Sequence, residues 1–286
     1  MNTLRAAALL AALLTAGAAP AQNADAPPKR EALRVCQDPN NLPFSNTSAE
    51  GIENRIAEVF GKALGLPVSY YSFPNRFAFI RNTLRYKLPG QDYPCDIVMG
   101  VPTGFDQVSV TKPYYRSTYA LVFPAGKGLD HVRSGEDFLR TDRAVLGKLR
   151  IGLYDRSPAS EWLAKHGLVD NGVPYKILNA DPAQYPGEII EKDLAKGEID
   201  AAIVWGPIAG FFAKRVKSPA LVVVPLRSEP GVKFDYEMAM GVRYGEREWK
   251  QQVEGLIESR KAEIQAILRE FGVPMVDESY AAKQQP

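Results

Sequence analysis

The chain has few of the residues that commonly hold metal ions or catalyse reactions. It contains only two histidines and two cysteines in 286 residues, so a zinc or iron–sulfur site would need unusual ligands. An excess of one charge is also missing, because 35 Lys and Arg stand against 33 Asp and Glu. Without a basic run the chain has no electrostatic means of binding nucleic acid or an anionic membrane. The remaining composition, 45% hydrophobic, indicates a globular protein with one large core or two smaller ones.

The N-terminal segment has the pattern of a secretory signal. Arg5 precedes an apolar run at 6–14, which is too short to span a bilayer. Ala19-Pro20-Ala21 offers a small-x-small cleavage site, with 16–18 as an alternative. We therefore predict a signal peptide over residues 1–21 and a periplasmic location for the mature chain. No later stretch provides the eighteen or so consecutive apolar residues of a membrane span.

The two cysteines, Cys36 and Cys95, belong to segments with the pattern of strands, at 33–36 and 95–99. In an oxidising compartment a disulfide is the expected state, and adjacent strands of one sheet would bring the pair together. Neither cysteine has the CxxC spacing or the helix N-terminus of a reactive thiol. We therefore predict a structural disulfide, which would stabilise the fold by about 4 kcal/mol in the chain-entropy model.

Alternating strands and helices predict an α/β protein. In the first half a turn-rich loop at 38–44 leads to a capping box at Thr47 and Glu50, and a helix then runs to Gly65. The pattern restarts near residue 149, where Ser157 is predicted as the N-cap of a helix with Pro158 at its first position. Strands are predicted at 33–36, 68–73, 95–100, 119–123, 149–154, 173–178, 201–205 and 221–225. Further helices are predicted around Phe77–Leu88, around 189–197, from Pro207 and over 246–271.

This order predicts two lobes with a cleft between them. The first lobe would comprise residues 22–120 and 224–286, and the second residues 121–223. Sheets of this kind bind ligands beyond the carboxyl ends of their strands. The loops expected there are 38–44, 101–106 and 155–157, the last of which opens a helix suited to an anion.

Several motifs, in matching order, resemble the amino-acid-binding family of type II periplasmic solute-binding proteins. They are GIEN at 51–54, CDIVMG at 95–100, KPYY at 112–115, IGL at 151–153 and GEIDAA at 197–202. Longer segments resemble a branch of that family associated with quinoprotein alcohol dehydrogenases, the MxaJ/XoxJ type. They are RVCQDPNNLPFS at 34–45, FIRNTL at 79–84, VMGVP at 98–102, PYYRSTY at 113–119 and WGPIAG at 205–210.

The resemblance implies a periplasmic partner of a PQQ-dependent methanol dehydrogenase, with a role in its activation or maturation. It also shows what this chain lacks. Amino-acid-binding members place an Arg after the third strand to pair with the ligand carboxylate, and an Asp in a later strand-to-helix turn for the ammonium. Here residues 102–106 contain no Arg, and Trp205 stands where the Asp is expected. Losing both partners would lower amino-acid affinity by several kcal/mol.

Three functions remain open from these residues. The first is a non-catalytic accessory protein whose cleft or lobe surface binds the dehydrogenase or its partly folded subunit. The second is an ABC-importer receptor for a solute other than an amino acid, and a small-molecule ligand of the cleft stays open. The third, an enzyme, is disfavoured because no acid–base pair or nucleophile motif is present. We predict no cofactor and no metal site, and the calcium or lanthanide type of the dehydrogenase stays open. Candidate cleft residues are Asp38, Asn40, Asn41, Phe44, Phe73, Tyr114, Tyr115, Arg116, Asp155, Arg156, Ser157 and Trp205.

Overall fold

The computed structural model describes residues 30–75, 78–176 and 183–282. The predicted signal peptide, Phe77 and the last residues of the strand predicted at 173–178 lie outside these ranges. Glu31–Pro286 form one compact unit, and the division into lobes after residues 120 and 223 stays a prediction. No helix in the described ranges is long and apolar enough to cross a membrane.

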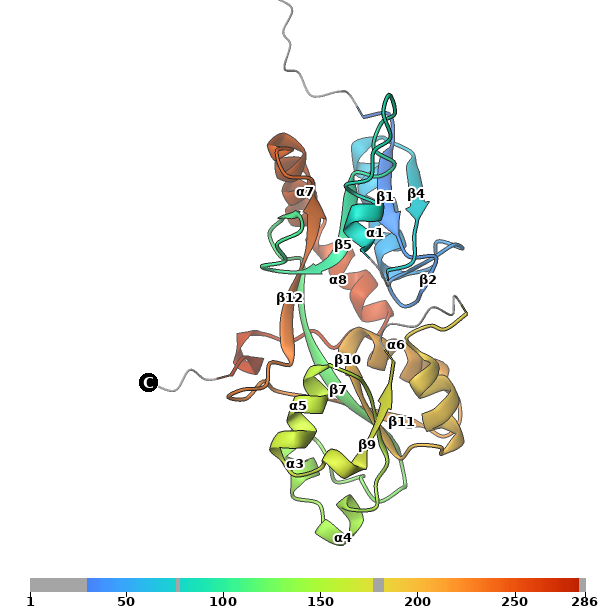
Figure 1. The fold of residues 1–286 in the computed structure, drawn as a ribbon, viewed down its shortest axis with the longest axis vertical. Coiled ribbons are helices and arrows are strands. Elements are labelled where there is room, and N and C mark those ends of the chain that lie inside the picture. The colour runs from blue at the N-terminus through green and yellow to red at the C-terminus, as the bar shows by residue number, and fades with distance from the viewer. Residues whose placement is uncertain (1–29, 76–77, 177–182, 283–286) are drawn as a thin grey trace, which may run out of the picture. The chain divides into compact units, whose positions relative to one another are not determined.

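A mixed sheet, whose strands follow the order β4-β1-β5-β12-β7-β10-β8-β9, organises this unit (Figure 1). β11 pairs with β7, and β6 pairs with β12. The strands are β1 (Leu33–Gln37), β4 (Val68–Ser72), β5 (Ile97–Pro102), β6 (Ser109–Val110), β7 (Tyr115–Pro124), β8 (Ile151–Tyr154), β9 (Gly172–Tyr175), β10 (Ala201–Trp205), β11 (Leu221–Pro225) and β12 (Asp235–Val242). A separate small hairpin consists of β2 (Asn40–Asn41) and β3 (Ser45–Asn46).

The helices pack on both faces of the sheet. They are α1 (Ile52–Leu64), α2 (Phe79–Asn82), α3 (Gly135–Leu139), α4 (Arg143–Leu146), α5 (Pro158–Lys165), α6 (Gly206–Arg215), α7 (Arg247–Ser259) and α8 (Lys261–Glu270). Short helical turns are η1 (Val169–Asn171), η2 (Ile189–Leu194), which is π-helical, and η3 (Glu278–Tyr280). Figure 1 shows α1, α7 and α8 near β1 and β5, and α3, α5 and α6 near β8–β10.

Strand alternation divides the core between the two faces of the sheet. On β10, Ala201 and Ile203 join one hydrophobic cluster with α5, whereas Ala202 and Val204 join another with α6 and η2. The parallel pairing predicted for the first half is present, since β1 pairs in parallel with β4 and β5. β5 is largely buried, as expected for the near-continuous apolar run at 95–100.

Two strands, β7 and β12, connect the parallel parts of the sheet. Asp235–Met238 of β12 pair antiparallel with 115–118 of β7. β7 then continues to 119–122, which pair with β10. The sequence patterns predicted only 119–123 of β7 and did not predict β12, so the strands that join the two parts were recognised incompletely.

Several element boundaries differ from the sequence predictions. The capping box at Thr47 and Glu50 is wrong: Gly51 is the N-cap of α1, and its N–H donates to Asn54 Oδ1 at 3.1 Å. The helix predicted around Phe77–Leu88 is reduced to the four residues of α2. The single helix predicted over 246–271 is two helices, separated at Arg260.

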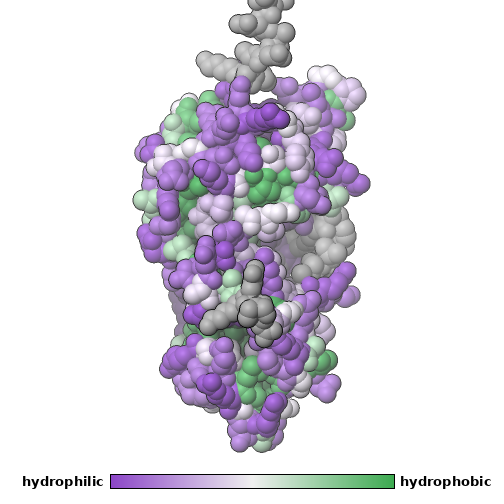
Figure 2. Space-filling model, turned by 90° about the vertical axis from the view of Figure 1, so that its left-hand side faces the viewer, coloured by the Kyte–Doolittle hydropathy of each residue, from purple (hydrophilic) through white to green (hydrophobic). Residues whose placement is uncertain are grey.

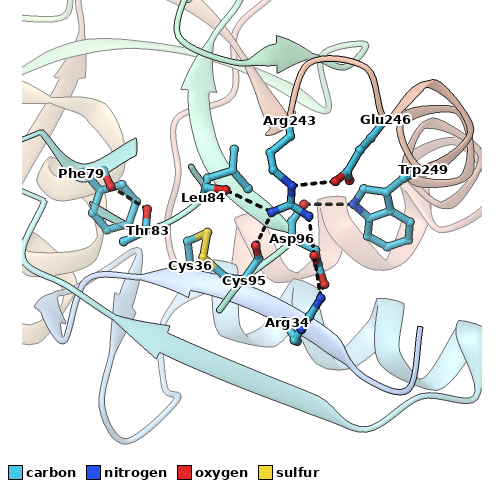
Figure 3. Close-up of a disulfide and its surroundings, with 10 residues drawn as sticks. All are labelled: Arg34, Cys36, Phe79, Thr83, Leu84, Cys95, Asp96, Arg243, Glu246 and Trp249. Carbon is cyan, nitrogen blue, oxygen red and sulfur yellow. Dashed lines mark hydrogen bonds and ion pairs between the residues drawn. A yellow bond between two sulfur atoms is a disulfide. The ribbon is translucent and has the colours of Figure 1, made fainter. Parts of the chain in front are cut away.

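The predicted disulfide between Cys36 and Cys95 is present (Figure 3). It links β1 to the residue that precedes Asp96 and β5. Beside it the buried Arg243 guanidinium donates to the Cys95 carbonyl oxygen at 2.5 Å and to Asp96 Oδ1 at 2.5 Å. Arg34 also donates to Asp96, at 2.7 Å. The two arginines therefore balance a buried carboxylate, and Arg243 fixes the end of β12 against the disulfide.

Candidate ligand-binding cleft

Two cavities of about 440 and 420 Å³ adjoin in the structure. Asp38, Asn41, Asn75 and Trp205 line both, so we treat them as one cleft. We name the larger the tyrosine cavity, because Tyr119, Tyr154, Tyr175 and Tyr185 line it. The smaller we name the Glu53 cavity, after a carboxyl group in its wall.

Asp38 holds the conformation of the loop between β1 and α1, which lines the cleft. Its Oδ1 accepts the Asn40 N–H at 2.8 Å, and its Oδ2 accepts the Asn75 N–H at 2.6 Å. Ser45 Oγ donates to the Asp38 carbonyl oxygen at 3.0 Å. One carboxylate thus ties this loop to the segment after β4, as short loop acids commonly do.

Asn40 connects the loop to the other side of the cleft. Its Nδ2 donates to the Gln184 carbonyl oxygen at 3.5 Å, shortly before η2. Phe44, in the same loop, lines the Glu53 cavity and packs against the cluster of β10 and α6. The loop after β1 therefore contacts elements from both parts of the sheet.

Trp205 is the aromatic residue that the two cavities share. It is the last residue of β10 and the N-cap of α6, so the strand-to-helix turn presents its ring to the cleft. The ring makes edge contacts with Tyr119 and Tyr236, at centroid distances of 5.5 and 5.8 Å. The position expected for an ammonium-binding Asp is therefore occupied by a fixed, uncharged ring.

Three of the tyrosine hydroxyls in the tyrosine cavity are engaged in hydrogen bonds. Tyr154 donates to the Pro186 carbonyl oxygen at 2.7 Å, and Tyr175 donates to Asp193 at 2.5 Å. Tyr185 donates to Glu191 at 2.9 Å, and burial raises the pKa of Tyr185 to about 12. With their hydroxyls committed, these side chains offer the cavity mainly ring surface.

Glu53 is the most unusual titratable group of the cleft. It lies in the first turn of α1, is 9% exposed and lines the Glu53 cavity. Burial, followed by the nearby negative charge of Asp38, raises the pKa of Glu53 to about 8. Among the described residues no side chain or backbone group donates a hydrogen bond to its carboxyl group.

Gly100 provides the space for the Glu53 carboxyl group. It follows the buried Met99 in β5 with φ +68°, and a Cβ added there would lie 2.6 Å from Glu53 Oε1. A side chain at position 100 would therefore both strain the backbone and displace the carboxyl group. Glycine here allows the acid to lie against the strand.

The structure brings together five of the predicted cleft residues. Asp38, Asn41 and Trp205 line both cavities, Asn40 lines the tyrosine cavity, and Phe44 lines the Glu53 cavity. All five come from the loop after β1 or from the end of β10. The predicted loop at 101–106 also contributes to the Glu53 cavity.

The other predicted residues lie outside the walls of these two cavities. Tyr114 and Tyr115 are buried in the core around α1 and α8, with ring centroids 4.8 Å apart. Arg116 forms ion pairs with Asp235 at 2.5 Å and Glu237 at 3.2 Å. Phe73 packs against the cluster that contains the disulfide.

The loop predicted as an anion site follows β8. Ser157 is the N-cap of α5 as predicted, but its Oγ donates to the Tyr154 carbonyl oxygen at 2.6 Å instead of accepting from the helix. Arg156 is exposed with φ +56°, and the Asp155 N–H donates to the Tyr175 carbonyl oxygen at 2.8 Å. Tyr154, the residue before this loop, lines the tyrosine cavity.

Sequence reasoning did not single out Glu53, Asn75 or the four tyrosines of the tyrosine cavity as cleft residues. An available signal for Glu53 was its place, an acid in the first turn of an apolar helix directly behind the cleft loop. The tyrosines gave no such signal, because Tyr119, Tyr154 and Tyr175 have the pattern of ordinary strand residues. The described residues contain no group of three or more His, Cys, Asp or Glu placed to hold a metal ion.

The fold with its cleft is that of the type II periplasmic binding proteins, as the sequence predicted. MxaJ from Methlophaga aminisulfidivorans superposes with a TM-score of 0.71 at 21% identity, over 86% of this chain and all of that one. The periplasmic binding protein XoxJ from Methylobacterium extorquens AM1 superposes with a TM-score of 0.69 at 34% identity, with the same coverage.

Sequence comparison identifies the branch. Protein MoxJ from Methylorubrum extorquens is 30% identical over 295 residues, which cover 94% of each chain, and the chain belongs to this MoxJ/XoxJ family. A second MoxJ, from Paracoccus denitrificans, is 27% identical over 86% of this chain and 90% of its own length. No protein-family model matches the chain.

Proposed function

We propose that this protein is a non-catalytic, periplasmic accessory protein of a PQQ-dependent methanol dehydrogenase. In this proposal the cleft binds a segment of the dehydrogenase and aids its activation or maturation. The supporting sequence motifs are those of the MxaJ/XoxJ type, and the named relatives belong to the same family. The disulfide is in keeping with an oxidising compartment.

One observation carries the proposal: the described residues of the cleft do not include the Arg and the Asp at the two positions where a receptor for free amino acids is expected to have them. Trp205 takes the place of the ammonium partner, and the described residues that line the two cavities include no arginine. Aromatic rings and side-chain amides predominate instead, which suits a peptide segment better than a zwitterion.

Exposed hydrophobic side chains are dispersed over the described part of the surface. On the face drawn in Figure 2, hydrophilic side chains predominate and hydrophobic ones occur in small separate groups. The large hydrophobic side chains exposed in the described ranges are scattered over different elements: Tyr86, Leu88, Val145, Val169, Tyr244 and Met275. Single exposed apolar residues are normal for a soluble protein and do not mark an interface.

The histidines support a binding role more than a catalytic one. His131 Nε2 lies 3.0 Å from Thr141 Oγ1, and His166 Nε2 lies 2.9 Å from Glu229 Oε1. Both are paired with structural neighbours, and neither is among the residues that line the cleft. The described cleft therefore holds no histidine for acid–base chemistry.

Copurification from periplasm of methanol-grown cells, followed by a dehydrogenase assay with and without the purified protein, tests the proposal. We expect association at micromolar concentration and a change in dehydrogenase activity. Absence of both would overturn it.

A metabolite panel in a thermal-shift assay tests the alternative, an importer receptor for a small solute other than an amino acid. A ligand at one hundred times its Kd adds about 2.7 kcal/mol of stability, and such a hit without dehydrogenase binding would favour the alternative.

A further inference from the structure

The Glu53 cavity contains a buried carboxyl group with no hydrogen-bond partner among the described residues. Glu53 is nine-tenths buried, and its carboxyl group lies against Gly100 in the cavity wall. Its oxygens are not among the fully buried atoms that lack a partner in the described ranges, so they reach the space of the cavity. A group bound there can donate the hydrogen bonds that the protein itself does not supply.

The charges that line the cavity indicate which kind of ligand would bind to the Glu53 carboxyl group. Asp38 and Glu53 are the charged residues among its described lining, and both are acidic. Two carboxyl groups in one partly enclosed cavity repel each other, and a cation between them removes that repulsion. Burial raises the pKa values of Tyr114 and Tyr115, and the nearby Glu53 raises them further, so both phenols stay neutral.

Aromatic rings complete the cavity. Trp205, Phe44 and Phe105 line it together with the two acids. The faces of such rings attract ammonium and guanidinium groups, and this attraction is stronger in a desolvated site. Acids and rings in one cavity are therefore complementary to an organic cation. The volume of the cavity, about 420 Å³, suits a side chain rather than a bare ion.

We propose that the Glu53 cavity binds an alkylammonium or guanidinium group, with Glu53 as its counter-ion. The source of that group, a Lys or Arg side chain of the dehydrogenase, rests on the proposed function. A free organic cation is the other source of the same chemistry. Binding converts Glu53 from its protonated form to a carboxylate, so the proton leaves to the buffer as the ion pair forms.

Two capped amino acids of similar shape test the site on the purified mature chain. N-acetyl-lysine methylamide carries an ammonium group, and N-acetyl-norleucine methylamide does not. In calorimetric titrations at pH 7 we expect the lysine probe to bind at least about tenfold more tightly, the effect of one charge-assisted hydrogen bond. Titrations in buffers of different ionisation enthalpy should show proton release with the lysine probe.

Glu53→Gln should abolish both the preference and the proton release, because glutamine keeps the shape but cannot ionise. Glu58→Gln, an exposed acid on the same helix, should retain both. Equal binding of the two probes to the wild type, or a preference that survives Glu53→Gln, would overturn the cation site.

Dehydrogenase binding by the same variants separates the sources. A dehydrogenase affinity that falls about tenfold with Glu53→Gln but not with Glu58→Gln places the cation on the partner. Tight binding of n-butylammonium, with unchanged dehydrogenase affinity in Glu53→Gln, assigns the cavity to a free cation. Failure of every dehydrogenase assay with intact lysine-probe binding would refute the proposed function and leave the site standing.

Discussion

Glu53 couples the cleft to the stability of the fold. Its pKa is raised from 4.5 to about 8, chiefly by burial. Between these values the folded protein holds a proton on Glu53 that the unfolded chain releases. Stability therefore falls as pH rises through this window, by at most about 5 kcal/mol between pH 4.5 and 8. The groups that face Glu53 from neighbouring elements are Asp38, Tyr114 and Tyr115.

Replacing Glu53 by Gln should remove this pH dependence, since glutamine stays neutral. We expect urea denaturation at pH 5, 6, 7 and 8 to show a growing advantage of Glu53→Gln over the wild type. At pH 5, where Glu53 is protonated in the folded state, the two proteins should differ least. Glu58→Gln should follow the wild-type curve. A constant difference between Glu53→Gln and the wild type across this range would refute the raised pKa.

At the scale of elements, the disulfide holds the first strands of the sheet together. Cys36 pairs with Val98 in the register of β1 and β5, and its sulfur is bonded to Cys95, 59 residues away. We expect the double variant Cys36→Ser/Cys95→Ser to lose about 4 kcal/mol of unfolding free energy in the chain-entropy model. Urea denaturation under non-reducing conditions measures this loss. The wild type in reducing buffer is the control and should lose a similar amount, and an unchanged midpoint in both would contradict the prediction.

Most of the sheet was predictable because its buried strands are continuous apolar runs. β12 was missed although its residues alternate: Tyr236, Met238, Met240 and Val242 face the core around α1 and α8. Its acidic start and the Ala and Gly on its other face have low strand propensity. Tertiary pairing on both sides with β5 and β7 overrides that weak local signal.

The cleft was predictable where chain topology alone fixes position. The loop after β1 and the end of β10 must lie at the carboxyl edge of the sheet, and their residues do line the cavities. The direction of a side chain within a strand was not predictable in the same way. Tyr114 and Tyr115 point into the core. Arg116 forms ion pairs with acids of β12, a strand that the sequence patterns did not predict.

At the scale of the whole molecule, α6 and the end of α8 approach each other closely. A Cβ on Gly210 would lie 1.9 Å from the Gly272 carbonyl oxygen. Phe211 stacks on Phe271 at 5.5 Å, and Lys214 Nζ donates to the Glu270 carbonyl oxygen at 3.2 Å. This contact joins a helix of the β10 side to the last helix of the β1 side.

Gly210→Ala should therefore separate these two helices. The backbone carbonyl cannot move aside as a flexible side chain would, so we expect a loss of about 1–3 kcal/mol in unfolding free energy. Gly255→Ala is the matched control, an exposed helical glycine with nothing within 4 Å of an added Cβ. It should be neutral or stabilising by up to about 1 kcal/mol. Equal melting temperatures for the two variants would show that the α6–α8 contact adapts freely.

The order in which the core is assembled follows from the position of β12 and the two last helices. The hydrophobic cluster on β1, α1 and β5 takes more than half of its buried residues from Met238–Val273. A chain that emerges N-terminus first therefore exposes the apolar faces of its earliest elements until almost the whole polypeptide is present. The part of the molecule that is made first therefore has its hydrophobic core completed last, when the final helices are present.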